Sequence, residues 1–392
     1  MRTRTTGDRL RLMRVLYVSE IQWLSQVSRK HQMVRRFPPD WDVLFLSPVN
    51  LAPGENSFRP RSDRVPARLT YASVFLPKPD STHAPLRALT RVLGATGGAS
   101  VMRHITQSSP DVVVCSYLWA APLVARIRAL GIPVVYDLND LHPQFYPDAR
   151  DEAVRMFRKL VADATEVVAS SESLRKEAGR GVVIGNGVDL ETFGGRIDVE
   201  RPAELSEGPA ADCPKLVMYV GSVDDRLDLG VLRRTLEMLT SDTEGTGLVM
   251  VGRIFEAVRP AMQTLLKAFP KTLFVTGRVD YARLPALMSH ADVGIAPFVL
   301  TPRTEGINPN KLYMYAAMDM DIVTTPFSDD VRRHEDAIRV ASTPAEFAAA
   351  VHSAIGDDER RRSLRERIAL PNSWAERAEE FTRLLSGLAQ GD

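Results

Sequence analysis

Acidic, amide and imidazole side chains gather in the stretch YDLNDLHPQF, residues 136–145, directly after an apolar run. Carboxylates and imidazoles in such a place can orient substrate hydroxyls, and one of them can accept a proton from an attacking hydroxyl. Asp137, Asp140 and His142 are therefore the candidate catalytic residues. A structural interpretation stays equally open, in which Asp140 caps a helix and His142 only packs.

The sequence lacks the motifs of several common enzyme classes. Neither half has a G-x-G-x-x-G fingerprint after its first predicted strand, which argues against a nicotinamide dehydrogenase. There is no G-x-x-x-x-G-K-[ST] loop and no G-x-S-x-G elbow, so a P-loop NTPase is excluded and a serine hydrolase is disfavoured. The seven histidines form no H-E-x-x-H or H-x-H cluster, so we expect no zinc site.

Short apolar runs alternate with longer amphipathic stretches along the chain. The runs are apolar throughout, as parallel strands buried on both faces are. Their alternation with helical patterns predicts right-handed crossovers and a doubly wound α/β fold, whose ligands bind at the carboxyl ends of the strands. The expected strands are 14–19, 42–47, 111–116, 133–137, 166–170, 215–221, 247–252, 272–277, 292–297 and 321–325.

Length and charge narrow the class of protein. A chain of 392 residues is too long for one core, so we expect two or three domains. The net charge of +1 excludes a general nucleic-acid coat, because neutralising phosphates needs a basic excess. No apolar run reaches the length of a membrane span, and the basic N-terminus lacks the features of a signal peptide. Cys115 and Cys213 form no C-x-x-C pair, and we expect a soluble, cytoplasmic protein with reduced thiols.

The alternation of strands and helices breaks once, at residues 194–214, where Gly, Pro and acidic residues replace the apolar pattern. This composition is typical of a linker. We therefore expect an N-terminal Rossmann-like domain over residues 1–195, a linker over 196–214 and a second Rossmann-like domain over 215–372. The last helix, residues 373–392, has apolar residues along one side, and packing on the N-terminal domain stays open.

Four segments, in chain order, carry motifs of one enzyme family: GVVIGNGVDLETF (181–193), KLVMYVGSVDDRLDLGVL (215–232), TGRVDYARLPALMSHADVGIAPF (276–298) and NPNKLYMYAAMDMDIVTTP (308–326). They resemble the V-I-P-N-G-V-D-x-x-x-F, Y-V-G-x-I-x-x-R-x-D, G-x-V-x-Y-x-x-L-P and P-N-K-L-Y-E-Y segments of retaining GT-B glycosyltransferases of family 4. The resemblance implies two Rossmann-like domains that face each other across a cleft. The N-terminal domain then meets the acceptor, and the C-terminal domain binds a nucleotide-sugar donor.

The resemblance also implies roles for residues of the second domain, where a cation should stabilise the leaving diphosphate. Arg226 is one candidate, against a surface salt bridge with Asp224 or Asp228, and Lys311 near a helix start is the other. The residues after two further strands should hold the base, and residues 305–310 should meet the sugar while Asn308 or Asn310 caps the next helix. The predicted donor residues are Gly221, Arg226, Arg253, Arg278, Val279, Glu305, Gly306, Asn310, Lys311 and Met314.

On the acceptor side, the resemblance implies contacts from Glu20 and Trp23, although Trp23 is also a candidate core residue. Asn139 stands where many relatives have the histidine of an H-D pair.

Two departures from the family pattern fall in the last motif. Met314 replaces the glutamate that in the family holds the nucleotide ribose, and methionine is a poor hydrogen-bond acceptor. Asp319 and Asp321 replace a glycine and a proline, and we interpret this D-M-D as a turn rather than a metal-binding D-x-D.

We therefore predict a retaining, metal-independent glycosyltransferase that needs no cofactor and uses a UDP- or GDP-sugar. Its acceptor is a small molecule, such as a natural product, or a lipid-linked glycan, and no nucleic acid is a partner. Contact with a membrane surface and the oligomeric state stay open. Two alternatives remain: a non-enzymatic GT-B-like protein that binds a partner glycosyltransferase, and a sugar-nucleotide epimerase.

Overall fold

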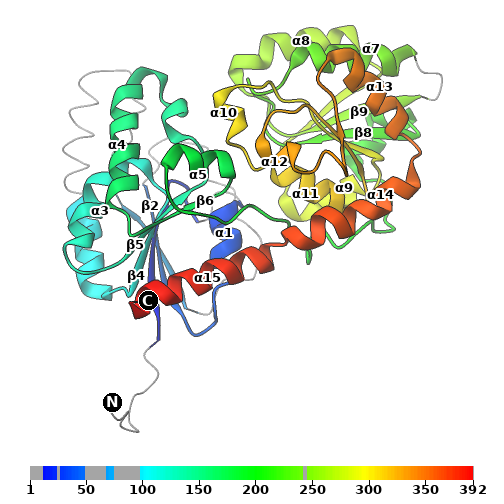
Figure 1. Cartoon of the computed structure of the whole chain (residues 1–392). Helices are drawn as coiled ribbons and strands as arrows, with labels where there is room; N and C mark the ends of the chain where they lie inside the picture. Colours follow the sequence, from blue (N-terminus) through cyan, green and yellow to red (C-terminus); the bar gives the residue numbers. More distant parts are fainter. Residues whose placement is uncertain (1–11, 24–26, 49–67, 75–97, 242–244, 392) are drawn as a thin grey trace. The chain divides into compact units, whose positions relative to one another are not determined.

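The computed structural model describes residues 12–23, 27–48, 68–74, 98–241 and 245–391 (Figure 1). The basic N-terminus, residues 1–11, lies outside the described residues. The chain divides into two compact units. The N-terminal unit comprises Met1–Ser170, Leu174–Ile184 and Ala378–Asp392, and the C-terminal unit comprises Ser171–Ser173 and Gly185–Arg377.

The N-terminal unit is built on a parallel sheet whose strand order is β3-β2-β1-β4-β5-β6-β7 in the described residues. Its central strands are buried along nearly their whole length, which explains their uninterrupted apolar sequences. The strands are β1 Arg14–Val18, β2 Asp42–Pro48, β3 Leu69–Val74, β4 Val112–Cys115, β5 Val134–Leu138, β6 Glu166–Ala169 and β7 Val182–Val183.

Helices on this unit follow the strands in the expected alternation. The α3 and α4 helices lie side by side after β4 and β5 (Figure 1). From Ala378 onward the last helix belongs to the N-terminal unit, where the Phe381 ring stacks on Phe37 with 6.2 Å between centroids. The helices are α1 Arg29–Val34, a helix over residues 98–108, α3 Ala121–Arg128, α4 Arg150–Asp163, α5 Glu172–Ala178 and α15 Trp374–Gln390.

The C-terminal unit has a second parallel sheet, of order β10-β9-β8-β11-β12-β13 in the part of the chain described. The strand order reverses between β8 and β11, and in such sheets ligands bind beyond the carboxyl ends of the strands at this switch point. The strands are β8 Lys215–Val220, β9 Thr246–Val251, β10 Leu273–Gly277, β11 Val293–Ala296, β12 Asp321–Thr324 and β13 Arg339–Val340.

Helices cover both faces of the second sheet, with α7 and α8 above it and α9 and α11 below it in the view of Figure 1. Two parallel-sheet Rossmann-like units confirm the predicted fold class. The helices are α6 Ala203–Ser206, α7 Leu229–Ser241, α8 Arg259–Ala268, α9 Leu284–Met288, α10 Pro302–Glu305, α11 Asn310–Ala317, α12 Asp329–Arg332, α13 Pro344–Ala354 and α14 Asp358–Leu364.

The segment expected to be a linker, residues 196–214, instead belongs to the C-terminal unit. Although it has no apolar period, Leu205 is fully buried. Arginines also hold it in place: Arg196 donates to the Ala291 carbonyl at 2.5 Å and Arg201 to the Cys213 carbonyl at 2.8 Å. The chain thus passes between the units at 184/185 rather than near 195.

No helix in the described ranges combines the length and the apolar character that crossing a bilayer requires.

Candidate functional site

Glycines mark the carboxyl ends of three adjacent strands in the C-terminal unit. Gly221 follows β8, Gly252 follows β9 and Gly277 ends β10, all with positive φ. A Cβ on Gly252 would lie 1.9 Å from the Gly221 carbonyl oxygen, so no other residue fits there. Bare backbone at this edge lets a ligand approach the strand ends closely.

Arg226 lies in the loop after β8, which pairs with the loop after β11. Its carbonyl accepts a hydrogen bond from the Val299 N–H at 2.8 Å, and its guanidinium lies 5.4 Å from the centroid of the Phe298 ring. Nε and Nη2 donate to the two carboxylate oxygens of Asp224 at 2.8 and 2.6 Å. The salt bridge with Asp224, weighed as an alternative to a phosphate contact, is thus present, and it fixes the direction of the guanidinium.

The carboxylate of Asp224 is itself largely buried. Burial raises its pKa, but the hydrogen bonds and the charge of Arg226 outweigh this effect and leave the pKa lowered. Asp224 therefore stays ionised and is neutralised by Arg226.

Lys311 forms no salt bridge with a carboxylate in the part of the chain that the structure describes. Its ammonium lies over two rings, 4.0 Å from the centroid of Tyr219 and 4.2 Å from that of Phe298. A Cβ on Gly221 would come within 3.2 Å of the Lys311 Nζ. The ammonium therefore lies at the sheet edge formed by Gly221, Gly252 and Gly277, called the glycine edge below. Burial, and then the nearby positive charge of Arg226, lower the lysine pKa well below its usual value. The charge of Asp224 offsets this lowering only in part, so the desolvated ammonium favours an anion beside it.

The residues predicted to hold the base lie on neighbouring strand ends. Arg253 follows Gly252, its carbonyl accepts from the Val223 N–H at 3.0 Å, and its guanidinium lies 5.2 Å from the Phe255 ring centroid. Arg278 is exposed, whereas Val279 packs against the core. A bridge between Gly252 and Gly277 brings the two loops together, so the predicted base contacts share one edge with Gly221.

The loop over residues 305–310 is held by side chains from distant parts of the sequence. Glu305 forms a salt bridge with Arg332 at 3.5 Å, and the Gly306 carbonyl accepts from the Ser171 hydroxyl at 2.9 Å. Asn310 has its side-chain oxygen buried without a hydrogen-bond partner in the described structure. An unsatisfied acceptor at this place suits a hydroxyl-bearing ligand.

Neither Asn308 nor Asn310 caps α11, which corrects that expectation. The N-cap residue is Pro309, and no side chain bonds the free N–H groups there. Asn308 is used elsewhere: its side-chain oxygen accepts from the Asn186 N–H and its amide donates to the Tyr313 hydroxyl, both at 2.9 Å. Within the described residues, the first two N–H groups of α11, those of Asn310 and Lys311, therefore have no capping side chain and are available to an anion.

Met314 is a core residue, 8% exposed, on the same helix as Lys311. It packs among apolar side chains of the C-terminal unit. The position that the family uses for a ribose-binding carboxylate is therefore apolar in this chain.

The two aspartates of D-M-D differ in their surroundings. Asp319 has φ +52°, the left-handed conformation of a residue that ends a helix. Asp321 instead begins β12, fully buried, and accepts from Arg339 Nε at 2.8 Å, so a turn is the wrong interpretation for this residue. Within the described ranges, no group of three or more His, Cys, Asp or Glu side chains is placed to hold a metal ion.

In the N-terminal unit, Asp137 is fully buried at the end of β5. One carboxylate oxygen accepts from the Tyr17 hydroxyl at 2.6 Å and the other from Arg29 Nε at 3.0 Å. Both oxygens are occupied and neither reaches the surface. Asp137 therefore forms a buried ion pair that ties α1 to the sheet, and its catalytic role stays a prediction.

Glu20 and Trp23 differ in their exposure. The Glu20 carboxylate accepts from Lys30 Nζ and from the Ser116 hydroxyl, the latter at 2.8 Å, and 26% of its side chain is exposed. Trp23 is buried, with its ring centroid 4.8 Å from that of His31, as in the core alternative. Glu20 thus keeps a surface for an acceptor and Trp23 does not.

Asn139, Asp140 and His142 lie together after β5 and before the short 3₁₀ helix His142–Phe145. Asn139 donates to the Asp140 carboxylate at 3.1 Å and keeps a buried side-chain oxygen without a partner. Asp140 makes no side-chain cap of that helix. His142 shares a hydrogen bond of 3.1 Å with the Tyr136 hydroxyl, and burial lowers its pKa, so its ring is neutral near pH 7.

Several partners of the candidate site residues are not predictable from the sequence. Tyr219 and Phe298 lie inside recognised motifs, Y-V-G and I-A-P-F, but only the structure shows that they enclose Lys311. Lys30, the partner of Glu20, had no signal beyond its place in an amphipathic stretch.

Comparison with known proteins finds similar glycosyltransferases and similar folds. Residues 31–187 match the glycosyl transferase 4-like domain. The chain is 23% identical over 274 residues to the putative teichuronic acid biosynthesis glycosyltransferase TuaH of Bacillus subtilis (strain 168). That match covers 66% of this chain and 62% of the relative, less than two thirds of its length.

Solved structures match nearly the whole chain. Sucrose-phosphate synthase from Thermosynechococcus elongatus is similar with a TM-score of 0.75 at 13% identity, over 97% of this chain and all of that one. The Anabaena protein Alr3699/HepE, solved with UDP and glucose, has a TM-score of 0.68 at 15% identity over 95% of this chain and 99% of its own. At these identities the likeness establishes the fold, two Rossmann-like domains of the GT-B type.

Proposed function

We propose that this chain, which is similar to family 4-like GT-B glycosyltransferases, moves a sugar from a nucleotide diphospho-sugar to an acceptor hydroxyl with retention of the anomeric configuration. The observation that carries the proposal is the Lys311 ammonium, which lacks a carboxylate partner in the described residues and lies beside Arg226 and the glycine edge. These are the features of a diphosphate site.

Breaking the bond between the anomeric carbon and the diphosphate oxygen leaves negative charge on the diphosphate. Lys311 and Arg226, together with the open N–H groups at the start of α11, offset that charge as it develops. Because two cations supply this stabilisation, we propose that no metal ion takes part. Turnover that survives EDTA is the expected result, and loss of turnover restored by Mg²⁺ or Mn²⁺ would overturn it.

The donor is a UDP- or GDP-sugar. The Anabaena structures that contain UDP and UDP-glucose support the uridine form. Because Met314 supplies no carboxylate for the ribose, we propose that the ribose hydroxyls are held by other groups, and that affinity comes mainly from the diphosphate.

The acceptor binds to the N-terminal unit. Its hydroxyl oxygen forms a bond to the anomeric carbon of the donor sugar as the hydroxyl loses its proton. Glu20 has an exposed, fixed carboxylate that suits acceptor hydroxyls, and neutral His142 and Asp140 are the groups that can take the proton. The relative named for teichuronic acid biosynthesis supports a glycan-type acceptor, either lipid-linked or small.

The test is a thermal-shift panel of UDP, GDP, ADP and TDP on the purified chain. A nucleotide at one hundred times its dissociation constant stabilises the protein by about 2.7 kcal/mol, which is readily seen. A shift with UDP or GDP alone is expected. No shift with any nucleotide would overturn the proposal in favour of the non-enzymatic alternative.

Two variants then locate the diphosphate. Lys311→Met and Arg226→Ala should each weaken UDP binding by about 1.5–3 kcal/mol in calorimetry, while uridine binding stays the same. Arg259→Ala is the control, because Arg259 forms an exposed pair with Glu256 on the same unit. Equal losses for UDP and uridine would remove the residue from the phosphate site.

A further inference from the structure

The hydrogen-bond ladder at the switch point of the C-terminal sheet ends early. The β8 and β11 strands pair only at Val217–Val293 and Met218–Gly294. On the outer sides of both strands the pairing continues to the end, through Val220–Val251 and Ala296–Thr324. Beyond Met218, therefore, the two central strands separate while each stays attached to its other neighbour.

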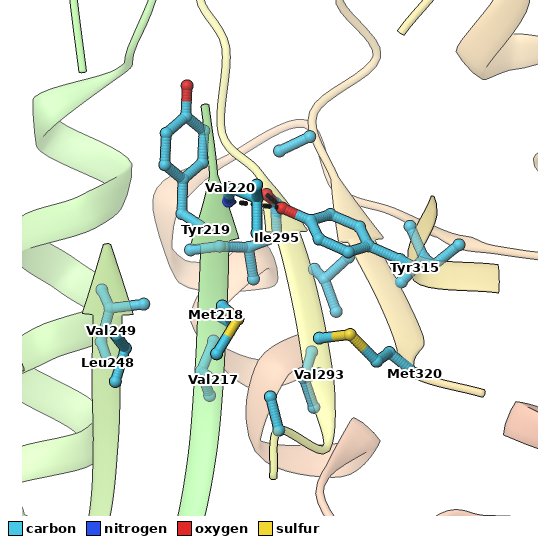
Figure 2. Packing of buried hydrophobic residues seen from close by; sticks show 14 of the residues in the cluster. Val217, Met218, Tyr219, Val220, Leu248, Val249, Val293, Ile295, Tyr315 and Met320 are labelled. Carbon is cyan, nitrogen blue, oxygen red and sulfur yellow. Dashed lines mark hydrogen bonds between the residues drawn. The ribbon is translucent and has the colours of Figure 1, made fainter. Parts of the chain in front are cut away.

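A tyrosine hydroxyl occupies the place where the ladder stops (Figure 2). The Tyr315 hydroxyl accepts a hydrogen bond from the Val220 N–H at 2.9 Å and donates to the Ile295 carbonyl at 3.2 Å. Tyr315 is fully buried, and burial raises the pKa of its hydroxyl well above the usual value, so the group keeps the proton that it donates. One side chain thus satisfies a donor and an acceptor that the strands would otherwise give to each other.

The sequence of β11 makes room for this ring. A Cβ on Gly294 would lie 2.3 Å from the Cγ of Tyr315, closer than atoms can approach. Any other residue at 294 would push the ring away from the strand. Gly294 and Tyr315 therefore act together to place the hydroxyl between the strands.

The two backbone groups bound by Tyr315 are close in sequence to Tyr219 and Phe298, the two rings that contact Lys311. Val220 follows Tyr219 directly, and Ile295 precedes Phe298 by three residues. Lys311 and Tyr315 are four residues apart on α11, hence on the same face of the helix. The hydroxyl consequently fixes α11 against both strands at the turn from which the ammonium projects over its rings.

We infer that Tyr315 is a positioning residue for diphosphate binding, which it serves by holding the strands apart and setting Lys311 between Tyr219 and Phe298. The inference rests on the proposed function, in which Lys311 meets the donor diphosphate. Tyr315 itself touches no substrate.

The test is Tyr315→Phe, which removes the hydroxyl and keeps the ring. Calorimetry should show the dissociation constant for UDP raised roughly tenfold and that for uridine unchanged. Adding Tyr315→Phe to Lys311→Met should cost no further UDP affinity, because the hydroxyl acts through the lysine. Thr235→Val is the matched control: it removes another buried hydroxyl of this unit, bonded within α7, and should leave both constants unchanged.

Other outcomes distinguish a failure of the proposed diphosphate site from a failure of the role of Tyr315. If Lys311→Met leaves UDP affinity intact, the proposed diphosphate site fails. The role of Tyr315 alone is overturned if Lys311→Met weakens UDP binding and the folded Tyr315→Phe variant does not. The same conclusion follows if Tyr315→Phe weakens the binding of UDP and of uridine equally.

A second measurement serves if Tyr315→Phe does not fold. In the wild-type protein, hydrogen exchange should show the Val220 amide protected without UDP, as a hydrogen-bonded group is. Rapid exchange at Val220 while Val217 stays protected would overturn the inference.

Discussion

The two units carry similar charged residues near the carboxyl ends of their strands but neutralise them differently. In the N-terminal unit, buried Arg29 pairs with Asp137, and Lys30 pairs with Glu20. In the C-terminal unit, Arg226 pairs with Asp224, and Lys311 lies over two rings instead.

The difference has a functional meaning. A cation that is fully buried with its own carboxylate, as Arg29 is with Asp137, is neutral as a pair and out of reach of a ligand, so it contributes fixed geometry. Arg226, in contrast, keeps 26% of its side chain exposed beside its carboxylate. A desolvated cation without a carboxylate is destabilised until an anion arrives, and part of that cost returns as binding free energy. In the proposed function, the paired charges of the N-terminal unit would contact the acceptor, and Lys311 of the C-terminal unit would contact the diphosphate.

The largest effect that tests this comparison is on stability. Asp137→Asn removes the carboxylate charge that pairs with the buried Arg29 guanidinium, which should lower the free energy of unfolding by about 3–5 kcal/mol in urea titrations. UDP affinity should not change, because the pair lies in the other unit. Asp163→Asn is the control, since it removes only a partly exposed pair with Lys159 and should cost at most about 1 kcal/mol. A loss as small as the control's would mean that the Arg29 charge is not buried in solution.

A second test uses pH and the imidazole that packs beside this network. His31 bonds to Ser28 Oγ at 2.8 Å and to the Trp23 carbonyl at 2.9 Å, and burial lowers its pKa from 6.5 to about 4. The folded protein holds the His31 ring neutral. Its contribution to the free energy of unfolding is therefore complete above pH 6.5 and is lost as the pH falls from 6.5 through 4. The loss amounts to about 1.4 kcal/mol per pH unit, about 3 kcal/mol in all.

The His31→Gln variant should therefore lose this part of the acid dependence. Urea titrations between pH 7 and pH 4 should give a shallower fall in unfolding free energy for His31→Gln than for the wild type. His352→Gln, on an exposed position of α13, should follow the wild-type curve. Parallel curves for all three proteins would show that His31 is not held neutral by burial.

The sequence predicted the strands that are buried in the sheets, because their apolar runs can be recognised without tertiary contacts. All ten expected strands form, because central parallel strands are apolar along their whole length. The missed strands are β3, a half-exposed edge strand, and two-residue strands such as β7. An edge strand does not need the uninterrupted apolar run that identified the others.

The site was predictable only to the level of residue type. The motifs located Arg226 and Lys311, but which cation would have a carboxylate depends on tertiary contacts with Asp224, Tyr219 and Phe298. In the same way, Asp137 had the chemistry of a base, and only its contacts with Tyr17 and Arg29 show that it is enclosed.

The smallest expected effect concerns a carboxylate that, unlike that of Asp137, makes no ion pair or hydrogen bond among the described residues. Asp319 ends α11 in a left-handed conformation, φ +52°, where the family has glycine. A side chain costs free energy in this conformation, and the substitution removes only a through-space attraction to Arg196, because the Asp319 carboxylate forms no salt bridge among the described residues. Asp319→Gly should therefore raise the unfolding free energy by about 0.5–1 kcal/mol, net of the added entropy of the unfolded chain, in thermal and urea unfolding. Asp319→Ala separates backbone from charge, since it also removes the carboxylate but keeps a Cβ and should give no gain. If both variants lose stability alike, the Asp319 carboxylate makes a favourable interaction, and the contrast with the closed pairs of the N-terminal unit does not extend to the end of α11.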